Sequence, residues 1–172
     1  MKRLFCLAAI AVALLGHSFT AQAAGVEFAV GQTSGSTQTY RLGLQWDWDK
    51  SWWQTDVGRV TGYWSGAYTY WNGDKTVSNH SLSFSPVFVY EFAGQTVKPY
   101  LEAGIGVAVF AHDEVDDRRL GEAFQFEDRL GFGLRFAGGH EIGIRATHYS
   151  NAHINVTNDG IESFALHYTM PL

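Results

Sequence analysis

The sequence has little cysteine, little proline and no long apolar run beyond its first residues. Its single cysteine, Cys6, lies in the N-terminal segment, so the rest of the chain cannot form an internal disulfide. No stretch after residue 23 approaches the roughly 18 consecutive apolar residues that a transmembrane helix needs. This excludes a helical membrane protein but leaves a membrane barrel, whose strands cross with about 9–11 residues each.

Basic residues are also scarce: the chain has 12 Lys and Arg but 17 Asp and Glu. Such an acidic chain disfavours nucleic acid as a partner. Aromatic residues, by contrast, make up 15% of the chain, and there are 19 glycines but only three prolines. This composition favours an all-β domain.

The first 23 residues have the features of a secretory signal peptide. The basic start Met1-Lys2-Arg3 precedes an apolar stretch over 4–15, and an A-x-A cleavage site follows at 21–23. The apolar stretch is too short to span a membrane as a helix. We therefore expect residues 1–23 to be removed and residues 24–172 to form one exported domain.

The dominant pattern after the signal peptide is an alternation of apolar residues with polar or small ones. Residues 101–109 show it clearly, since the odd positions are Leu, Ala, Ile and Val and the even positions are Glu, Gly and Ala. A period of two indicates β-strands with one apolar face. Eight such segments are predicted, at residues 25–32, 39–49, 60–71, 81–93, 98–110, 123–136, 140–150 and 161–171.

Two all-β folds share this alternation, a soluble sandwich and a membrane barrel. A soluble sandwich carries charged residues along its outer face. Here the less apolar face carries Gly, Ala, Ser and isolated charges such as Glu102, Arg129 and Arg145, which suits the tight lumen of a small barrel. The other face carries large apolar residues, with Trp and Tyr toward the strand ends, which suits contact with lipid. We predict an all-β fold, an eight-stranded antiparallel transmembrane β-barrel in the bacterial outer membrane.

The connections between the segments give an orientation. With both termini in the periplasm, the short turns at 93–97 and 137–139 are periplasmic and the longer connection 111–122 lies outside. The segment 50–59 is longer than a periplasmic turn should be. Side chains just fill the lumen of an eight-stranded barrel, so we expect the lumen charges to neutralise one another rather than to line a pore.

Three polar residues interrupt the lipid-facing stripes of the last two segments. His148 and Ser150 share the face of Ile142 and Ile144, and Glu162 has the parity of the apolar residues that follow it. If His148 pairs with Glu162, the next three pairs all join apolar residues, so this register is self-consistent. Opposed residues have Cβ atoms about 4.5–5.5 Å apart, and Ser150 lies about 6.6–6.8 Å along the strand. A nucleophile, a base and an orienting acid are therefore predicted within hydrogen-bond reach on the lipid-facing wall.

The same pattern has a plain structural interpretation, in which the strands end among polar headgroups and these residues are ordinary interface residues. The residue pattern alone leaves both interpretations open. The run His112-Asp113-Glu114, with Asp116 and Asp117, is interpreted as a solvated outer loop rather than a metal site. We expect neither a metal nor a cofactor.

The run His148-Tyr149-Ser150-Asn151-Ala152, followed by NDGIES at 158–163, resembles the lipid A 3-O-deacylase (PagL) family of outer-membrane barrels. These motifs cover the last quarter of the chain, and the remainder matches in length, signal peptide and strand plan. The resemblance implies a triad of Ser150 as nucleophile, His148 as base and Glu162 as acid. It also implies hydrolysis of the 3-O-linked 3-hydroxyacyl chain of lipid A in the outer leaflet. Leu172 departs from the aromatic residue common at the end of such barrels.

Acyl transfer also needs donors for the oxyanion. The candidates are Asn151 and Asn158 and the loop N–H groups, including those of Ala152 and Gly160. Two alternative functions stay open: a non-catalytic structural or adhesive barrel, and another lipid A acyl-modifying enzyme such as an acyltransferase or phospholipase. Lipopolysaccharide and the outer membrane are the expected partners, and the sequence does not give the oligomeric state, for which a homodimer is one option.

Overall fold

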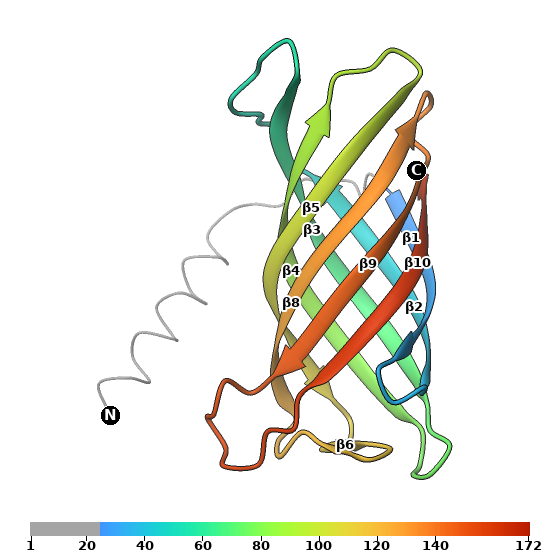
Figure 1. The fold of residues 1–172 in the computed structure, drawn as a ribbon, viewed down its shortest axis with the longest axis vertical. Coiled ribbons are helices and arrows are strands. Elements are labelled where there is room, and N and C mark those ends of the chain that lie inside the picture. The colour runs from blue at the N-terminus through green and yellow to red at the C-terminus, as the bar shows by residue number, and fades with distance from the viewer. Residues whose placement is uncertain (1–24) are drawn as a thin grey trace, which may run out of the picture.

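The computed structural model describes residues 25–172, so the predicted signal peptide lies outside the described residues. Eight antiparallel strands close into a barrel in the order β1-β10-β9-β8-β5-β4-β3-β2 (Figure 1). The barrel strands are β1 (Gly25–Thr33), β2 (Gln38–Asp47), β3 (Gly58–Asn72), β4 (Asn79–Phe92), β5 (Val97–Phe110), β8 (Phe124–Phe136), β9 (Glu141–Ser150) and β10 (Ile161–Pro171). The predicted eight-stranded antiparallel barrel is confirmed, and no strand end differs from its predicted position by more than two residues.

One element departs from the prediction. The connection 111–122 was expected to be a loop, but it contains the short hairpin of β6 (Glu114–Val115) and β7 (Arg118–Arg119). Two paired residues on each side are too few to produce a detectable alternation in the sequence. The hairpin turns over the end of the barrel, where Val115 becomes buried.

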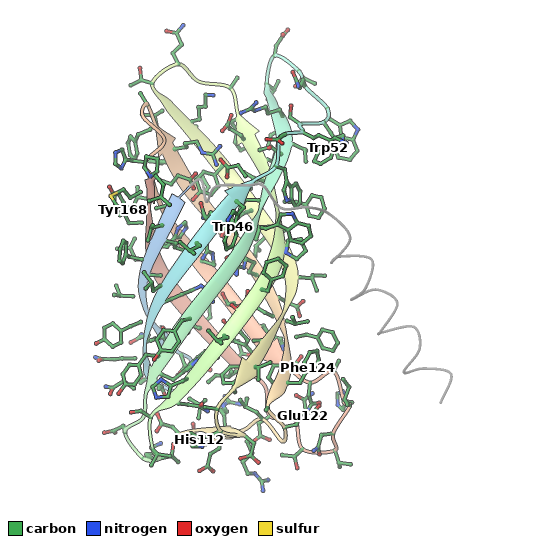
Figure 2. The ribbon with its side chains drawn as sticks, turned by 180° about the vertical axis from the view of Figure 1, so that it is seen from behind. Trp46, Trp52, His112, Glu122, Phe124 and Tyr168 are labelled. Atoms are coloured by element: carbon green, nitrogen blue, oxygen red, sulfur yellow. The ribbon has the colours of Figure 1, made fainter. Side chains whose placement is uncertain are left out.

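The alternation of side chains between lumen and outer wall is regular. On β5 the even residues from 100 to 110 are buried, and the odd residues from 101 to 109 are exposed. Large apolar side chains thus face outward while charged ones are enclosed, which is the arrangement of a barrel surrounded by lipid. Figure 2 shows Trp46 and Tyr168 in the upper half of the barrel, which holds the C-terminus in Figure 1, and Phe124 toward the other end. Within residues 25–172, no helix is long and apolar enough to cross a membrane.

Charged side chains pair inside the lumen. Arg145 donates to Glu27 at 2.8 Å and to Glu102 at 2.5 Å. Arg41 bridges Glu27 and Glu127, at 3.2 Å to each carboxylate. The prediction that the lumen charges neutralise one another is therefore confirmed. Arg145 links β1 to β5 and Arg41 links β1 to β8, so each cation connects strands that are distant in sequence.

The two ends of the lumen are closed differently. At the end that holds Gly25 and the C-terminus, Glu91 forms ion pairs with Arg59, Lys98 and Arg135. At the opposite end the lumen is filled by an apolar cluster of Trp71, Ala108, Phe110, Val115, Leu120, Tyr149 and Ile161. The cluster includes Tyr149 of β9 and Ile161 of β10, so the strand ends that carry the predicted triad pack against the apolar residues inside the lumen.

Candidate active site

His148 and Glu162 meet on the outer wall, near the outward ends of β9 and β10. The register pairs His148 directly with Glu162 and Ala146 with Phe164, so the predicted register is confirmed. The ring Nδ1 of His148 lies 3.1 Å from Oε1 of Glu162, and each side chain is 42% exposed. An ionised carboxylate can only accept hydrogen bonds, so Nδ1–H is the donor and the lone pair of Nε2 is left available as a base.

Ser150 is the last residue of β9, two positions beyond His148 on the same face. Its partner on the neighbouring strand is Phe126 of β8. In the described part of the chain, the hydroxyl of Ser150 has no hydrogen-bond partner and is partly exposed. Bonds between a nucleophile and its base are often long without substrate and shorten when substrate binds, so this geometry is compatible with a triad.

An apolar groove leads away from His148 along the outer wall. A cavity of about 260 Å³ is lined by His148, Glu162 and Asp128, and also by Leu130, Ala146 and Phe164. The last three residues also line a larger apolar groove of about 710 Å³. Ala146 stands between Leu130 and Phe164 in register. Its short side chain leaves a channel between two long ones, and this channel has the shape and polarity that a hydrocarbon chain requires.

The structure adds Asp128, which the sequence reasoning missed. Asp128 of β8 pairs directly with His148, is exposed and lines the same cavity. A signal for it existed, because Asp128 has the parity of the lipid-facing residues Leu130 and Phe132. A carboxylate in a lipid-facing stripe is costly, so Asp128 is a candidate functional position on the same ground as Glu162.

The two candidate asparagines have different surroundings. Asn151 is buried, and its side-chain amide donates to the carbonyl groups of Leu120 at 2.9 Å and Thr157 at 2.8 Å. Its backbone N–H donates to Oδ1 of Asn158 at 3.0 Å. Asn151 therefore uses its donors to brace the loop. Asn158 accepts through its oxygen, which leaves its NH₂ group without a partner in the part of the chain that the structure describes.

The two other oxyanion candidates lie at either end of the β9–β10 loop. Ala152 is exposed and has a positive φ of 50°, so the chain turns sharply just after Ser150. Gly160 has a φ of +64°, and a Cβ built on it would lie 3.1 Å from Cε1 of His148. The loop backbone thus approaches the histidine ring from the β10 side.

The fold and the candidate site together point to a class of protein: an outer-membrane β-barrel enzyme whose candidate functional side chains lie on its outer wall. A family model described as Lipid A 3-O-deacylase (PagL) matches residues 38–171. The chain is 58% identical to lipid A deacylase PagL of Pseudomonas aeruginosa over 173 residues, which covers all of both chains. It is also 44% identical to lipid A deacylase PagL of Bordetella bronchiseptica over 70 residues, 41% of this chain and 39% of that protein.

A solved crystal structure of the outer membrane enzyme PagL has 60% sequence identity and a TM-score of 0.84, and the match covers 87% of this chain and all of that one. The chain belongs to the lipid A 3-O-deacylase (PagL) family. The resemblance stated from the motifs, the enzyme class and the outer-membrane location are therefore confirmed.

Proposed function

We propose that this protein hydrolyses the ester between a 3-hydroxyacyl chain and the 3-position of lipid A, with Ser150 as nucleophile, His148 as general base and Glu162 as orienting acid. The observation that carries the proposal is the 3.1 Å contact between His148 and Glu162 at the head of an apolar groove. Ser150 follows two residues along the same strand face. Membership of the family supports the choice of substrate and of bond.

The outer leaflet is the proposed place of reaction. The site lies at the end of the barrel opposite the C-terminus, together with the connections 73–78, 111–123 and 151–160 (Figure 1). Outer-membrane barrels have short periplasmic turns and longer extracellular loops, so this end faces outward. Export through a signal peptide at residues 1–23 belongs to the same proposal.

The first half of the proposed reaction transfers the acyl group to the enzyme. Nε2 of His148 takes the proton of the Ser150 hydroxyl, and the oxygen attacks the ester carbonyl carbon. The tetrahedral intermediate collapses when the C–O bond to the sugar breaks and the imidazolium returns its proton to the leaving sugar oxygen. Glu162 holds the ring by Nδ1–H and stabilises its positive charge in both steps.

The second half regenerates the serine. Water gives a proton to His148, and its oxygen attacks the acyl carbon. The bond between that carbon and the Ser150 oxygen then breaks, the imidazolium returns its proton to the Ser150 oxygen, and a 3-hydroxy fatty acid leaves. The oxyanion of both intermediates requires positioned donors. The free NH₂ group of Asn158 and the backbone N–H groups of Ala152 and Gly160 fit this role better than Asn151, whose amide is already engaged.

The groove supplies the binding energy for the acyl chain. The acyl chain lies along Ala146, between the groove walls formed by Leu130 and Phe164. These walls direct the ester toward the nucleophile. Asp128, beside His148 at the head of the groove, offers a carboxylate that can accept a hydrogen bond from a hydroxyl of the substrate. An acyl chain without that hydroxyl would not form this hydrogen bond, which favours hydroxylated substrates.

The test is the mass of lipid A from a Gram-negative outer membrane that contains either the wild-type protein or Ser150→Ala. We expect loss of one hydroxyacyl chain with the wild type and unmodified lipid A with Ser150→Ala, because the nucleophile is gone. Ser78→Ala is the matched control, since Ser78 lies at the same end of the barrel on the opposite wall and should leave activity intact. Heat-modifiable migration checks that each barrel is folded.

Each competing function gives a different spectrum. A gain of an acyl chain would replace the proposal with an acyltransferase, and altered phospholipids beside intact lipid A would replace it with a phospholipase. Intact lipid A from a folded wild-type barrel would favour the non-catalytic barrel and would reduce His148, Ser150 and Glu162 to interface residues. Full activity of Ser150→Ala would remove Ser150 from the mechanism.

A further inference from the structure

Glu162 has a second partner, which comes from the other side of the strand. The hydroxyl of Ser34 donates to Oε2 of Glu162 at 3.1 Å, while Oε1 accepts from His148. The backbone N–H of Ser34 also donates to the carbonyl oxygen of Glu162 at 3.1 Å. The two carboxylate oxygens are therefore divided between the histidine of β9 and a serine that follows β1.

Barrel closure brings Ser34 to this position. β1 pairs with β10 up to Thr33 opposite Ser163, so the next residue along β1 lies beside Glu162. The turn that follows is fixed by its own bonds: the Thr33 N–H donates to the Thr37 carbonyl at 2.8 Å, and the Ser36 N–H donates to the Thr33 carbonyl at 3.0 Å. The backbone of Ser34 is thus held independently of its hydroxyl, so removal of the hydroxyl leaves the turn intact.

The carboxylate needs this second contact for a physical reason. The terminal torsion of a glutamate side chain has a broad minimum, so one hydrogen bond does not fix the plane of the carboxylate. Glu162 is 42% exposed, and water or lipid headgroups can compete for either oxygen. Two donors on two different oxygens determine the plane, and a charged acceptor makes both bonds stronger than neutral ones.

We propose that Ser34 is a positioning residue of this enzyme, which holds the Glu162 carboxylate in the orientation that receives Nδ1–H of His148. The proposal rests on the proposed function, because it assumes that Glu162 orients a catalytic histidine. Ser34 acts only through Glu162 and touches neither the ring nor the acyl groove. The functional unit is then a chain of four side chains, Ser150, His148, Glu162 and Ser34.

The first test compares kcat and KM of the full mature barrel in detergent micelles with lipid A as substrate. Ser34→Ala should lower kcat about threefold to tenfold, the effect of one hydrogen bond, and leave KM unchanged. Ser34→Thr keeps a hydroxyl and should restore activity. Ser36→Ala is the matched control, because Ser36 lies in the same turn and its side chain has no hydrogen bond within the described residues.

A double-mutant cycle separates positioning from a general structural effect. In a Glu162→Ala background, measured over long incubations, the further change Ser34→Ala should leave the residual rate unchanged, because the group that Ser34 positions is absent. An equal loss in both backgrounds would overturn the proposal, since Ser34 would then act through the fold of the turn.

The failure of this inference is distinguishable from the failure of the proposed function. Wild-type kcat in Ser34→Ala, together with an inactive Ser150→Ala, would overturn the role of Ser34 and leave the triad standing. An active Ser150→Ala or an unaffected Glu162→Ala would instead overturn the triad, and the role of Ser34 with it.

Discussion

At the scale of single residues, Gly160 shows how closely the loop backbone fits the histidine. Its φ of +64° lies in the left-handed region, and a Cβ at this position would meet Cε1 of His148 at 3.1 Å. A side chain is therefore disfavoured twice, once by the backbone conformation and once by the ring. The glycine lets the loop lie against His148 without displacing it.

Gly160→Ala should fold and yet lose activity. We expect about 1 kcal/mol of lost stability from the left-handed conformation. We also expect a fall in kcat of about 10-fold to 100-fold, because a displaced His148 no longer lines up with Ser150. The measurements are lipid A hydrolysis and urea unfolding on the same preparations.

Gly138→Ala is the control for strain alone. Gly138 has a φ of +90° in the β8–β9 turn, and the nearest atom to an added Cβ is Cδ2 of His140 at 3.9 Å. This variant should lose similar stability and keep its activity. Equal activities of the two variants would show that the Gly160 backbone does not position His148.

The site residues differ in how far the sequence could predict them. His148 and Glu162 could be paired because the register that joins them also joins every apolar pair below them. Asp128 could also have been predicted, because it alternates in step with the lipid-facing residues of its strand. Ser34 could not be predicted from the sequence. Its contact with Glu162 spans 128 positions and depends on the closure of β1 onto β10, and a turn residue carries no periodic signal of that closure.

At the scale of elements, Asp116 in the turn between β6 and β7 ties three connections together. Its carboxylate accepts hydrogen bonds from the hydroxyl of Thr37 and from the backbone N–H groups of Asp74, Lys75 and Thr76. Partial burial raises the pKa of Asp116, but the hydrogen bonds from Thr37 and from these N–H groups lower it more, so it lies below the ordinary value of 3.8.

The sign of this shift gives a pH dependence. A lowered pKa means that the bonds of Asp116 stabilise the loops fully above the unfolded-state value and are lost as the pH falls through the folded-state value. We therefore expect the N–H groups of 74–76 to exchange hydrogen slowly at neutral pH and to lose this protection below about pH 4. Hydrogen–deuterium exchange, corrected for the intrinsic pH effect, measures this.

Asp116→Asn should weaken the protection of 74–76 at neutral pH and remove its pH dependence. Asp117→Asn is the matched control, because Asp117 is the adjacent exposed carboxylate and makes no hydrogen bond within the described residues. If both variants exchange like the wild type, Asp116 does not hold the loops together.

The elements themselves were largely predictable. Lipid on one side and a narrow lumen on the other favour alternation, so most barrel strands carry their own signal. The signal of β3 is the least clear, because aromatic residues lie on both of its faces. The β6–β7 hairpin carries no such signal, because its stability comes from Val115 and Leu120 packing into the lumen end and from the bonds of Asp116. These contacts depend on the closed barrel and are not encoded in any local pattern.

At the scale of the whole molecule, the barrel depends on its enclosed charges. Arg145 of β9 joins Glu27 of β1 and Glu102 of β5, and all three are buried. Arg145→Met should lower the free energy of unfolding by about 3–5 kcal/mol, because it leaves the buried carboxylate of Glu102 without its cation and leaves Glu27 with Arg41 alone. Urea titration of the refolded barrel, followed by tryptophan fluorescence, measures the change.

Arg59→Ala provides the comparison. Arg59 is half exposed at the end of the lumen that holds the C-terminus. Its partner Glu91 keeps Lys98 and Arg135 when Arg59 is removed. We expect a cost of about 0–1 kcal/mol, as for an exposed ion pair. Equal costs for the two variants would mean that the central network does not hold the barrel closed.

The filled lumen and the outward-facing site have a consequence for how the substrate arrives. If Ser150 is the nucleophile proposed above, no part of the reaction uses the interior, and lipid A reaches Ser150 by sliding within the leaflet, already oriented with its chains parallel to the groove between Leu130 and Phe164. The encounter is a search in two dimensions rather than three. Its rate follows the number of lipid A molecules per unit area of membrane, so dilution with other lipids slows the enzyme even when the bulk concentration stays the same.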